Sequence, residues 1–177
     1  MIFCSFVSVF RAGVTFCLLA GLFVVTSRAE DWPQWRGPSR DGVWNEKGIV
    51  DKFAGPELAI KWRAPIGSGY SGPTVAAGRV YVTDRLVDPK QQERVWCFDE
   101  QTGAVVWSHV YDCTYSGVGY EAGPRASVSI DEGRAFSLGT MGHLFAFDAA
   151  KGDILWSRQL KDEYDIAIPG WGISASP

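Results

Sequence analysis

Short runs of β-branched and aromatic residues alternate with glycine-bearing turns along most of the chain. Two series share the order strand, turn, strand, namely residues 73–76, 77–78 and 79–83, and residues 126–130, 131–133 and 134–138. Runs of this length between glycine turns predict β-strands. Glycine or proline recurs every ten residues or so from residue 31 onward, which argues against long helices.

The chain also resembles itself at a shift of 49 residues. Residues 97–107 align with residues 146–156, and Phe, Asp, Gly and Trp recur at identical offsets. A third tryptophan, Trp62, ends the apolar stretch 58–62 and lies 45 residues before Trp107. Units of this length, each with strands and glycine turns, predict the blades of a β-propeller.

Each unit carries an aspartate and a glycine four residues apart, Asp99 with Gly103 and Asp148 with Gly152. The aspartate is expected to cap the turn through nearby backbone N–H groups, and the glycine to take a positive φ. Thr102 stands before the first glycine as a further member of the turn motif. The pattern therefore predicts a short hairpin loop at the same place in each unit.

The predicted fold class is all-β, a β-propeller of four-stranded antiparallel blades. Its expected parts are a signal peptide at 1–29, an N-terminal segment with a ring-closing strand at 30–62, and an incomplete propeller at 63–177, with blades at about 73–109 and 126–158 and a third starting near 172. Continuous apolar runs such as 105–107 and 144–147 suit sheets buried on both faces. The alternative, a β-sandwich, requires an alternating outer face and no such repeat.

Two complete blades are too few for a closed ring, which usually needs about four to eight. The chain is therefore expected to be the N-terminal part of a longer protein, or else to complete a ring with other copies. Either way, one blade face is expected to be uncovered, and residues 30–177 alone are expected to be poorly soluble or oligomeric.

Residues 1–29 differ in kind from the rest. Arg11 precedes an apolar run at 14–25, and small residues two apart, Ser27 and Ala29, follow it. This layout predicts a secretory signal peptide cleaved after Ala29. A retained membrane anchor is the alternative, but the run spans only about 18 Å as a helix. The protein is thus expected to be exported to the periplasm or cell surface, without a stable membrane span after cleavage.

Cleavage removes two of the 17 basic residues and leaves all 20 acidic ones, so the net charge falls to near −5. No basic run is left to bind nucleic acid. Of the four cysteines, Cys97 and Cys113 remain. If the hairpin loop is 99–103, the strand carries Cys113 about 26 Å beyond the residue facing Cys97. A disulfide needs Cα atoms within about 7 Å, so a buried free Cys97 is favoured.

The repeated Asp-x-x-Thr-Gly-x-x-x-Trp at 99–107 resembles the repeat of PQQ-like (pyrroloquinoline-quinone-type) β-propellers; the second copy has Lys151 in place of the threonine. Residues 31–42 look like the opening of a group of exported PQQ-like repeat proteins found in planctomycete-type bacteria, and Gly123, Pro124, Arg125, Trp171 and Gly172 fit that group. The resemblance implies that the repeated tryptophans dock between neighbouring blades, which concerns Trp62, Trp107 and Trp156.

PQQ-like repeats occur in quinoprotein dehydrogenases, which hold the quinone and calcium in the central channel, and in non-catalytic relatives that bind other proteins. A dehydrogenase of this kind would have adjacent cysteines and a Glu, Asn and Asp set on calcium. The chain has no adjacent cysteines, and Asn45 is its only asparagine. We therefore predict no cofactor or metal for these residues and assign no catalytic residue. PQQ and calcium belong only to the alternative, a dehydrogenase whose ligands lie elsewhere in a longer protein.

Aromatic and charged residues precede each predicted inner strand, where loops of successive blades converge on the channel mouth. The candidate binding residues are Tyr70, Tyr120, Glu121, Arg125 and Trp171; the alternative is that they only shape turns. His109 and His143 lie in no nucleophile motif and are expected to be structural. The sequence thus favours a non-catalytic, exported binding or scaffold module whose partner is a protein or a small ligand.

Overall fold

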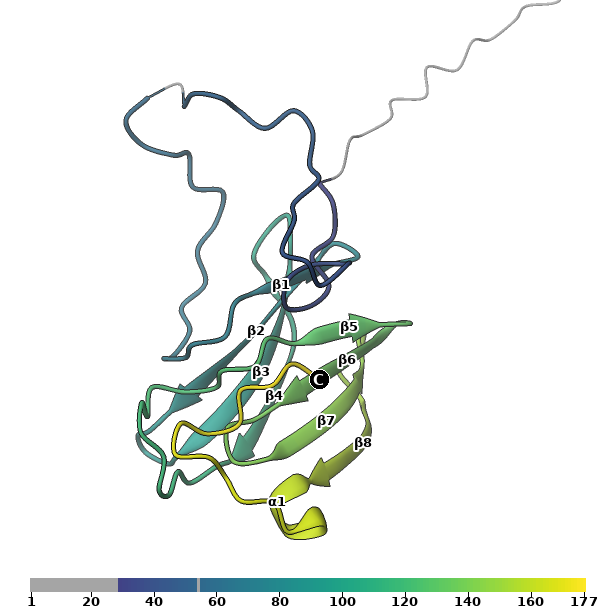
Figure 1. Ribbon diagram of the computed structural model, residues 1–177. Helices are drawn as coiled ribbons and strands as arrows, with labels where there is room; N and C mark the ends of the chain where they lie inside the picture. Colours follow the sequence, from purple (N-terminus) through teal and green to yellow (C-terminus); the bar gives the residue numbers. More distant parts are fainter. Residues whose placement is uncertain (1–28, 54) are drawn as a thin grey trace, which may run out of the picture.

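The computed structural model describes residues 29–53 and 55–177, so the predicted signal peptide lies outside the described residues except for Ala29. The described part consists of two β-sheets, an extended N-terminal segment and one short helix (Figure 1). The elements in chain order are β1 Thr74–Ala76, β2 Arg79–Leu86, β3 Gln92–Asp99, β4 Val105–Asp112, β5 Ser129–Asp131, β6 Arg134–Leu138, β7 His143–Asp148, β8 Ile154–Gln159 and α1 Leu160–Tyr164.

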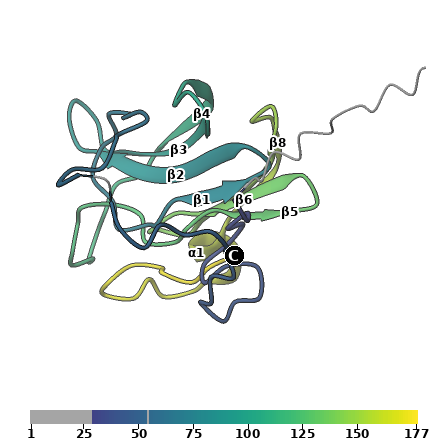
Figure 2. The ribbon, with the colours of Figure 1, turned by 90° about the horizontal axis from the view of Figure 1, so that it is seen from above.

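Each sheet is a four-stranded antiparallel meander in which sequence neighbours pair, with the orders β1-β2-β3-β4 and β5-β6-β7-β8. The two sheets lie side by side, as the views in Figures 1 and 2 agree. The predicted all-β class with four-stranded antiparallel blades is therefore confirmed.

The two sheets repeat one another down to an irregularity in their ladders. A register shift falls between Cys97 and Phe98 in the first sheet and between Ala146 and Phe147 in the second. Just before each shift, Cys97 pairs with Trp107 and Ala146 pairs with Trp156. The extra residue of a bulge bends the strand and increases its local twist. The copies differ in length at the connection between their second and third strands, residues 87–91 against 139–142.

The main core lies between the two sheets. Its buried members are Tyr81, Val95, Cys97, Trp107, Val128, Ala135, Phe145, Phe147 and Ala149. Residues of both sheets contribute, so the facing sheet surfaces are covered by one another. Only the facing surfaces are buried in this way: in the run 105–107, expected to be buried on both faces, Val105 and Val106 remain 54% and 38% exposed.

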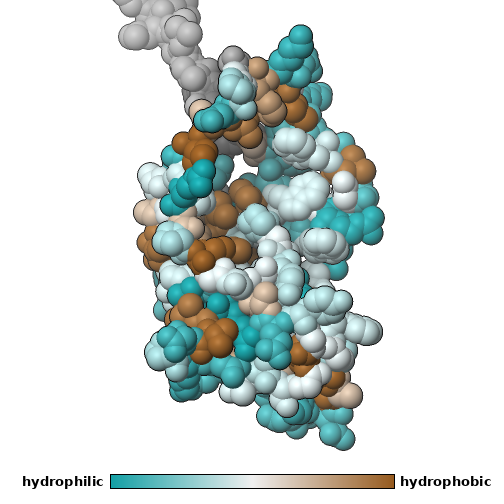
Figure 3. Space-filling model, turned by 90° about the vertical axis from the view of Figure 1, so that its left-hand side faces the viewer, coloured by the Kyte–Doolittle hydropathy of each residue, from teal (hydrophilic) through white to brown (hydrophobic). Residues whose placement is uncertain are grey.

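The N-terminal segment is attached to the first sheet at one end and then leaves it. Trp32 forms an antiparallel bridge with Val75, with N–H to O distances of 2.7 and 3.1 Å. Farther along, the chain loops away from the sheets before returning beside them (Figure 1). Val50, Phe53 and Leu58 in this loop are 63–64% exposed. On the face shown in Figure 3, hydrophobic surface forms separate patches among hydrophilic ones.

After β8 the chain forms the five-residue helix α1, which buries no residue, and returns toward the first residues of β5. Ile173 donates its N–H to the carbonyl of Thr140 at 3.0 Å, and Ser129 Oγ donates to the carbonyl of Pro177 at 2.9 Å. Residues 172–177, where a third blade is predicted to start, form no strand ladder with the other residues the structure describes. Within the described residues, no helix has the length and apolarity needed to cross a membrane.

Candidate functional site

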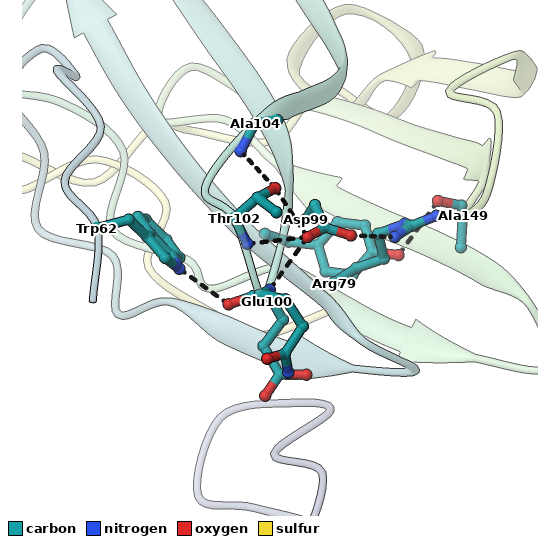
Figure 4. Close-up of polar contacts among 9 residues, drawn as sticks. Trp62, Arg79, Asp99, Glu100, Thr102, Ala104 and Ala149 are labelled. Atoms are coloured by element: carbon teal, nitrogen blue, oxygen red, sulfur yellow. Dashed lines mark hydrogen bonds and ion pairs between the residues drawn. The ribbon is translucent and has the colours of Figure 1, made fainter.

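Two of the three repeated tryptophans, Trp62 and Trp107, pack against glycine turns in the same geometry, and Figure 4 shows the hydrogen bond from Trp62 to Glu100. Trp62 Nε1 donates to the carbonyl of Glu100 at 2.8 Å, and Trp107 Nε1 donates to the carbonyl of Ala149 at 2.9 Å. Both acceptors lie three residues before the glycine of the turn. Trp107 thus joins β4 of the first sheet to the β7–β8 turn of the second, which accounts for the inter-sheet packing of this indole.

The glycines are required by the close approach of the indoles. A Cβ placed on Gly103 would lie 2.6 Å from Trp62 Cδ2, and one on Gly152 would lie 2.7 Å from Trp107 Cδ2. Their φ values of +72° and +80° are also unfavourable for other residues. The turn motif therefore has two functions, because it closes a hairpin and receives an indole.

The turn aspartates act as expected from the sequence. Asp99 Oδ1 accepts from the N–H groups of Gln101 and Thr102 and from Thr102 Oγ1, at 2.9–3.1 Å. The hydroxyl of Thr102, together with these N–H groups, lowers the pKa of Asp99. Asp148 accepts from two backbone N–H groups in the same way, at 2.9 and 3.0 Å. The second turn lacks the hydroxyl because Lys151 replaces the threonine.

Trp156 occupies the equivalent position in the second sheet but remains 40% exposed. Its indole lies 6.0 Å from the ring of Phe136 in the same sheet. Together with Leu144 and Pro177, these rings line a hollow of about 720 Å³. The surface that would receive a further glycine turn is thus an exposed apolar one.

Four of the five predicted mouth residues line a single pocket. Tyr70, Tyr120, Arg125 and Trp171 surround a hollow of about 200 Å³. They come from three separate segments, before β1, before β5 and after α1. The structure therefore brings together residues that are up to 101 positions apart in the chain.

Arg125 holds the pocket's loop by its backbone carbonyls. Nη2 donates to the carbonyls of Gly119 and Tyr120 at 2.9 and 2.5 Å. Nη1 donates to the carbonyl of Gly123 and to Thr140 Oγ1. All four of these acceptors belong to the protein, so the guanidinium braces the loop rather than presenting its N–H groups to the pocket.

Glu121 is not among the pocket-lining residues. Its carbonyl accepts a hydrogen bond from Arg85, a guanidinium that is only 4% exposed. Arg85 also lies 3.7 Å above the ring of Tyr115 and donates to Gln91 at 2.6 Å. The backbone of Glu121 is thus part of the loop's anchoring, and its side chain is exposed.

A buried carboxylate behind the pocket was missed by the sequence reasoning. Glu93 is fully buried and accepts hydrogen bonds from Tyr111 at 2.6 Å and Tyr115 at 2.5 Å. The N–H of Thr140 adds a third bond at 3.2 Å. Burial, followed by the Glu93 charge, raises the pKa of both tyrosines, so the hydroxyls remain donors. This network links β3 of the first sheet to the loop that carries Thr140.

The histidines and cysteines lie in packed surroundings. The His109 ring contacts Phe145 and Phe147 at 4.9 and 5.3 Å, and burial lowers its pKa. His143 has a lowered pKa for the same reason and lies 3.8 Å from Cys113 Sγ. Cys97 is a buried free thiol, as favoured from the sequence, and so is Cys113; burial raises the pKa of Cys97 to about 11.

A calcium site of the kind found in quinone-dependent dehydrogenases needs several oxygen ligands from carboxylates, amides or carbonyls. Over residues 29–53 and 55–177, no group of three or more His, Cys, Asp or Glu side chains is placed to hold a metal ion. The pocket itself offers aromatic rings, hydroxyls and a committed guanidinium. These residues do not fit a calcium site, and no chemical step is assigned to one.

Comparison with known proteins places these features in context. A family model described as "Outer membrane protein assembly factor BamB" matches residues 49–109 and 91–169. No curated protein sequence matches. Among solved structures, the quinohemoprotein alcohol dehydrogenase ADHIIG from Pseudomonas putida HK5 matches 74% of this chain with a TM-score of 0.56 and 22% identity.

Two other solved structures are similar over a smaller part. A europium-containing methanol dehydrogenase matches 58% of this chain with a TM-score of 0.45 and 21% identity, and BamB from Moraxella catarrhalis matches 56% with a TM-score of 0.40 and 19% identity. The chain spans 19%, 18% and 26% of the lengths of ADHIIG, the methanol dehydrogenase and BamB, respectively. The similarity to ADHIIG shows the fold, a β-propeller.

Proposed function

Since the chain belongs to the PQQ-like repeat family whose model is described as "Outer membrane protein assembly factor BamB", we propose that it is a non-catalytic binding module. In this proposal, the pocket of Tyr70, Tyr120, Arg125 and Trp171 binds a partner protein. The protein acts outside the cytoplasm, after cleavage of the signal peptide at residues 1–29.

The convergence of these side chains from three segments carries the proposal. Tyrosine, tryptophan and arginine are the residues most enriched where protein interfaces gain their binding energy. The rings are exposed, Tyr120 to 77% and Trp171 to 62%, although the loops that bear them are hydrogen-bonded to neighbouring loops. Rings held on an ordered scaffold lose little conformational entropy when a partner binds.

The docking geometry supports a scaffold role as well. The indole of Trp62, at the end of the N-terminal segment, packs on the Gly103 turn. The indole of Trp107 packs on the Gly152 turn in the same way. We therefore propose that residues 58–62 act as the outermost strand of a ring-closing blade. On the opposite side, Trp156 is proposed to dock on the glycine turn of a further blade.

The proposed function is tested by site-specific photocrosslinking. A photoreactive phenylalanine analogue at position 120 of the full-length protein is expected to crosslink a defined partner in cell-envelope extracts. Trp171→Ala should abolish this crosslink, because it removes a pocket wall, and should leave the melting temperature unchanged within about 1 °C, because the ring is exposed.

Trp44→Ala provides the matched control, since Trp44 is also exposed, at 55%, and lies outside the pocket. Arg125→Ala is a less suitable probe, because loss of the guanidinium leaves loop carbonyls without donors and is expected to lower the melting temperature. Crosslinking that persists unchanged in Trp171→Ala would contradict the assignment of the pocket.

The second candidate function is a quinone- and calcium-dependent dehydrogenase, and the fold shared with ADHIIG favours it. Its ligands would have to come from outside the described residues. Addition of the quinone and calcium to the full-length protein would then produce a new absorption band and dye-linked alcohol oxidation. The binding-module proposal expects neither.

A further inference from the structure

The backbone around the pocket has little left to offer a ligand. The N–H of Tyr70 donates to the carbonyl of Pro124 at 2.8 Å, and the N–H of Gly119 donates to the carbonyl of Gly170 at 2.6 Å. The N–H of Gly172 donates to the carbonyl of Pro169 at 2.7 Å. A peptide that binds by adding a strand needs a row of free N–H and C=O groups. The three segments of the pocket are instead tied to one another.

Charge recognition is also disfavoured. Arg125 is the only pocket-lining residue with a charged side chain, and its Nη1 and Nη2 atoms donate to Gly119, Tyr120, Gly123 and Thr140. A phosphate or carboxylate would have to displace these bonds, and modes that capture acidic motifs depend on free arginine forks. The ligand is therefore expected to be uncharged where it enters the pocket.

The pocket is small for the apolar face of an amphipathic helix. A helix seated by its i, i+4 and i+7 side chains needs a groove about 10 Å long. A hollow of about 200 Å³ accommodates one or two small apolar groups. What the pocket does present is three aromatic rings, with two phenol hydroxyls and an indole N–H as hydrogen-bond donors.

We infer that the pocket binds an extended, proline-rich segment of the partner protein in the polyproline II conformation. Polyproline II has no internal hydrogen bonds, so its carbonyls are free to accept from tyrosine hydroxyls and an indole N–H. Its rings and flat faces pack in aromatic-lined grooves, and the preformed helix reduces the entropy lost on binding. This inference rests on the proposed function, since it specifies the partner of that site.

The Arg125 side chain connects a pocket ring, Tyr70, to the partly buried ring of Tyr115 behind the pocket. The Arg125 guanidinium lies 5.3 Å from the centre of the Tyr70 ring and 5.7 Å from that of Tyr115. Tyr115 is in turn fixed by Glu93 and by Thr140, at 2.5 and 2.6 Å. One wall of the pocket thus stands on a buried network, which lowers the cost of ordering it when a ligand binds.

The test uses the full-length protein labelled with 5-fluorotryptophan, with the Trp171 resonance assigned by its absence in Trp171→Phe. A capped decaproline peptide is expected to shift this ¹⁹F resonance with saturation at a Kd of roughly 0.1–1 mM. Tyr120→Ala, which removes a pocket ring but keeps the Trp171 probe, should weaken binding about tenfold or more, and Trp44→Ala should leave it unchanged. A capped glycine-serine peptide of equal length and the neutral sugar cellohexaose serve as competing probes.

A shift with cellohexaose alone, or equal shifts with the glycine-serine peptide, would overturn the polyproline inference. So would decaproline binding that is unchanged in Tyr120→Ala, because the peptide would then not depend on the pocket rings. In these cases the proposed function still stands if the photocrosslink at position 120 depends on Trp171. Loss of that dependence would overturn both.

Discussion

Trp107 and Trp156 hold the same position in two copies of one pattern, and their surroundings differ sharply. Trp107 is 7% exposed and its indole N–H is bonded to the Gly152 turn, whereas Trp156 is 40% exposed. Both follow a bulge at the same distance. The difference shows that one sheet provides the tryptophan side chain at such an interface, and that the next sheet provides the glycine turn that buries this side chain.

The largest expected effect separates these two tryptophans. Trp107→Ala should lower the free energy of unfolding by about 3–5 kcal/mol, since it opens a cavity between the sheets. Trp156→Ala should cost about 1 kcal/mol or less, because its ring already contacts water. Urea unfolding of residues 30–177 at low protein concentration, followed by far-ultraviolet circular dichroism, measures both.

Trp107→Phe is the matched control, since it keeps an aromatic ring but removes the N–H donor to Ala149. It should fall between the wild type and Trp107→Ala. Equal losses at positions 107 and 156 in residues 30–177 would mean that Trp156 is as well covered as Trp107 in solution, and the contrast between the two copies would disappear.

The second effect concerns the receiving turn. Gly152→Ala should destabilise the protein by about 2–4 kcal/mol, because the added methyl group meets the Trp107 ring and φ is positive. Gly133→Ala should cost only about 1–2 kcal/mol, since its φ of +75° is similar but no atom lies within 4 Å of the added Cβ. Thermal unfolding of the two variants measures the difference, which isolates the steric part.

If the two alanine variants lose equal stability, the indole does not need a glycine beneath it. The repeat would then be explained by turn conformation alone.

The smallest effect is a pH dependence at His109, which packs on the docked face of the second sheet. Burial lowers its pKa, so the unfolded chain takes up a proton at higher pH than the folded one. The contribution to stability is therefore complete above the unfolded pKa of about 6.5 and is lost as the pH falls through the lowered folded pKa. The equivalent position in the second sheet, Arg158, is exposed and has no such constraint.

His109→Phe should reduce the drop in melting temperature between pH 7.5 and pH 5.5 by about 1–3 °C. Part of the drop should remain, since burial lowers the pKa of His143 in the same direction. An unchanged pH profile in His109→Phe would show that the ring is hydrated in solution.

The strand pairs and tryptophan turns were predictable because their signals are local. The Asp99 and Gly103 pair specifies a hairpin by itself, and the repeat at a shift of 49 residues identifies its partner copy. The convergence of the pocket residues was also accessible, since loops before inner strands meet at one end of stacked sheets. The helix α1 was not predicted, and its five residues carry little helical signal.

Glu93 and Arg125 could not be read from the sequence. Glu93 lies between Gln92 and Arg94, a polar run that is typical of an exposed strand, yet it is fully buried. Its burial depends on hydroxyls of Tyr111 and Tyr115, whose approach is set by the tertiary fold. Arg125 resembled a ligand-binding cation, but its donors are taken by loop carbonyls. Such roles arise from long-range contacts that no local pattern encodes.

The stretch from the bulge to the tryptophan has one length in both sheets, whereas the connection between the second and third strands does not. The comparison of the two copies thus shows that the connection between the second and third strands tolerates insertions, whereas the bulge and the tryptophan keep a fixed spacing. Residues 87–90 are exposed in the longer connection. An epitope or a fluorophore-binding tag inserted there would report the location of the protein in the cell. The contacts between each indole and its glycine turn would remain intact.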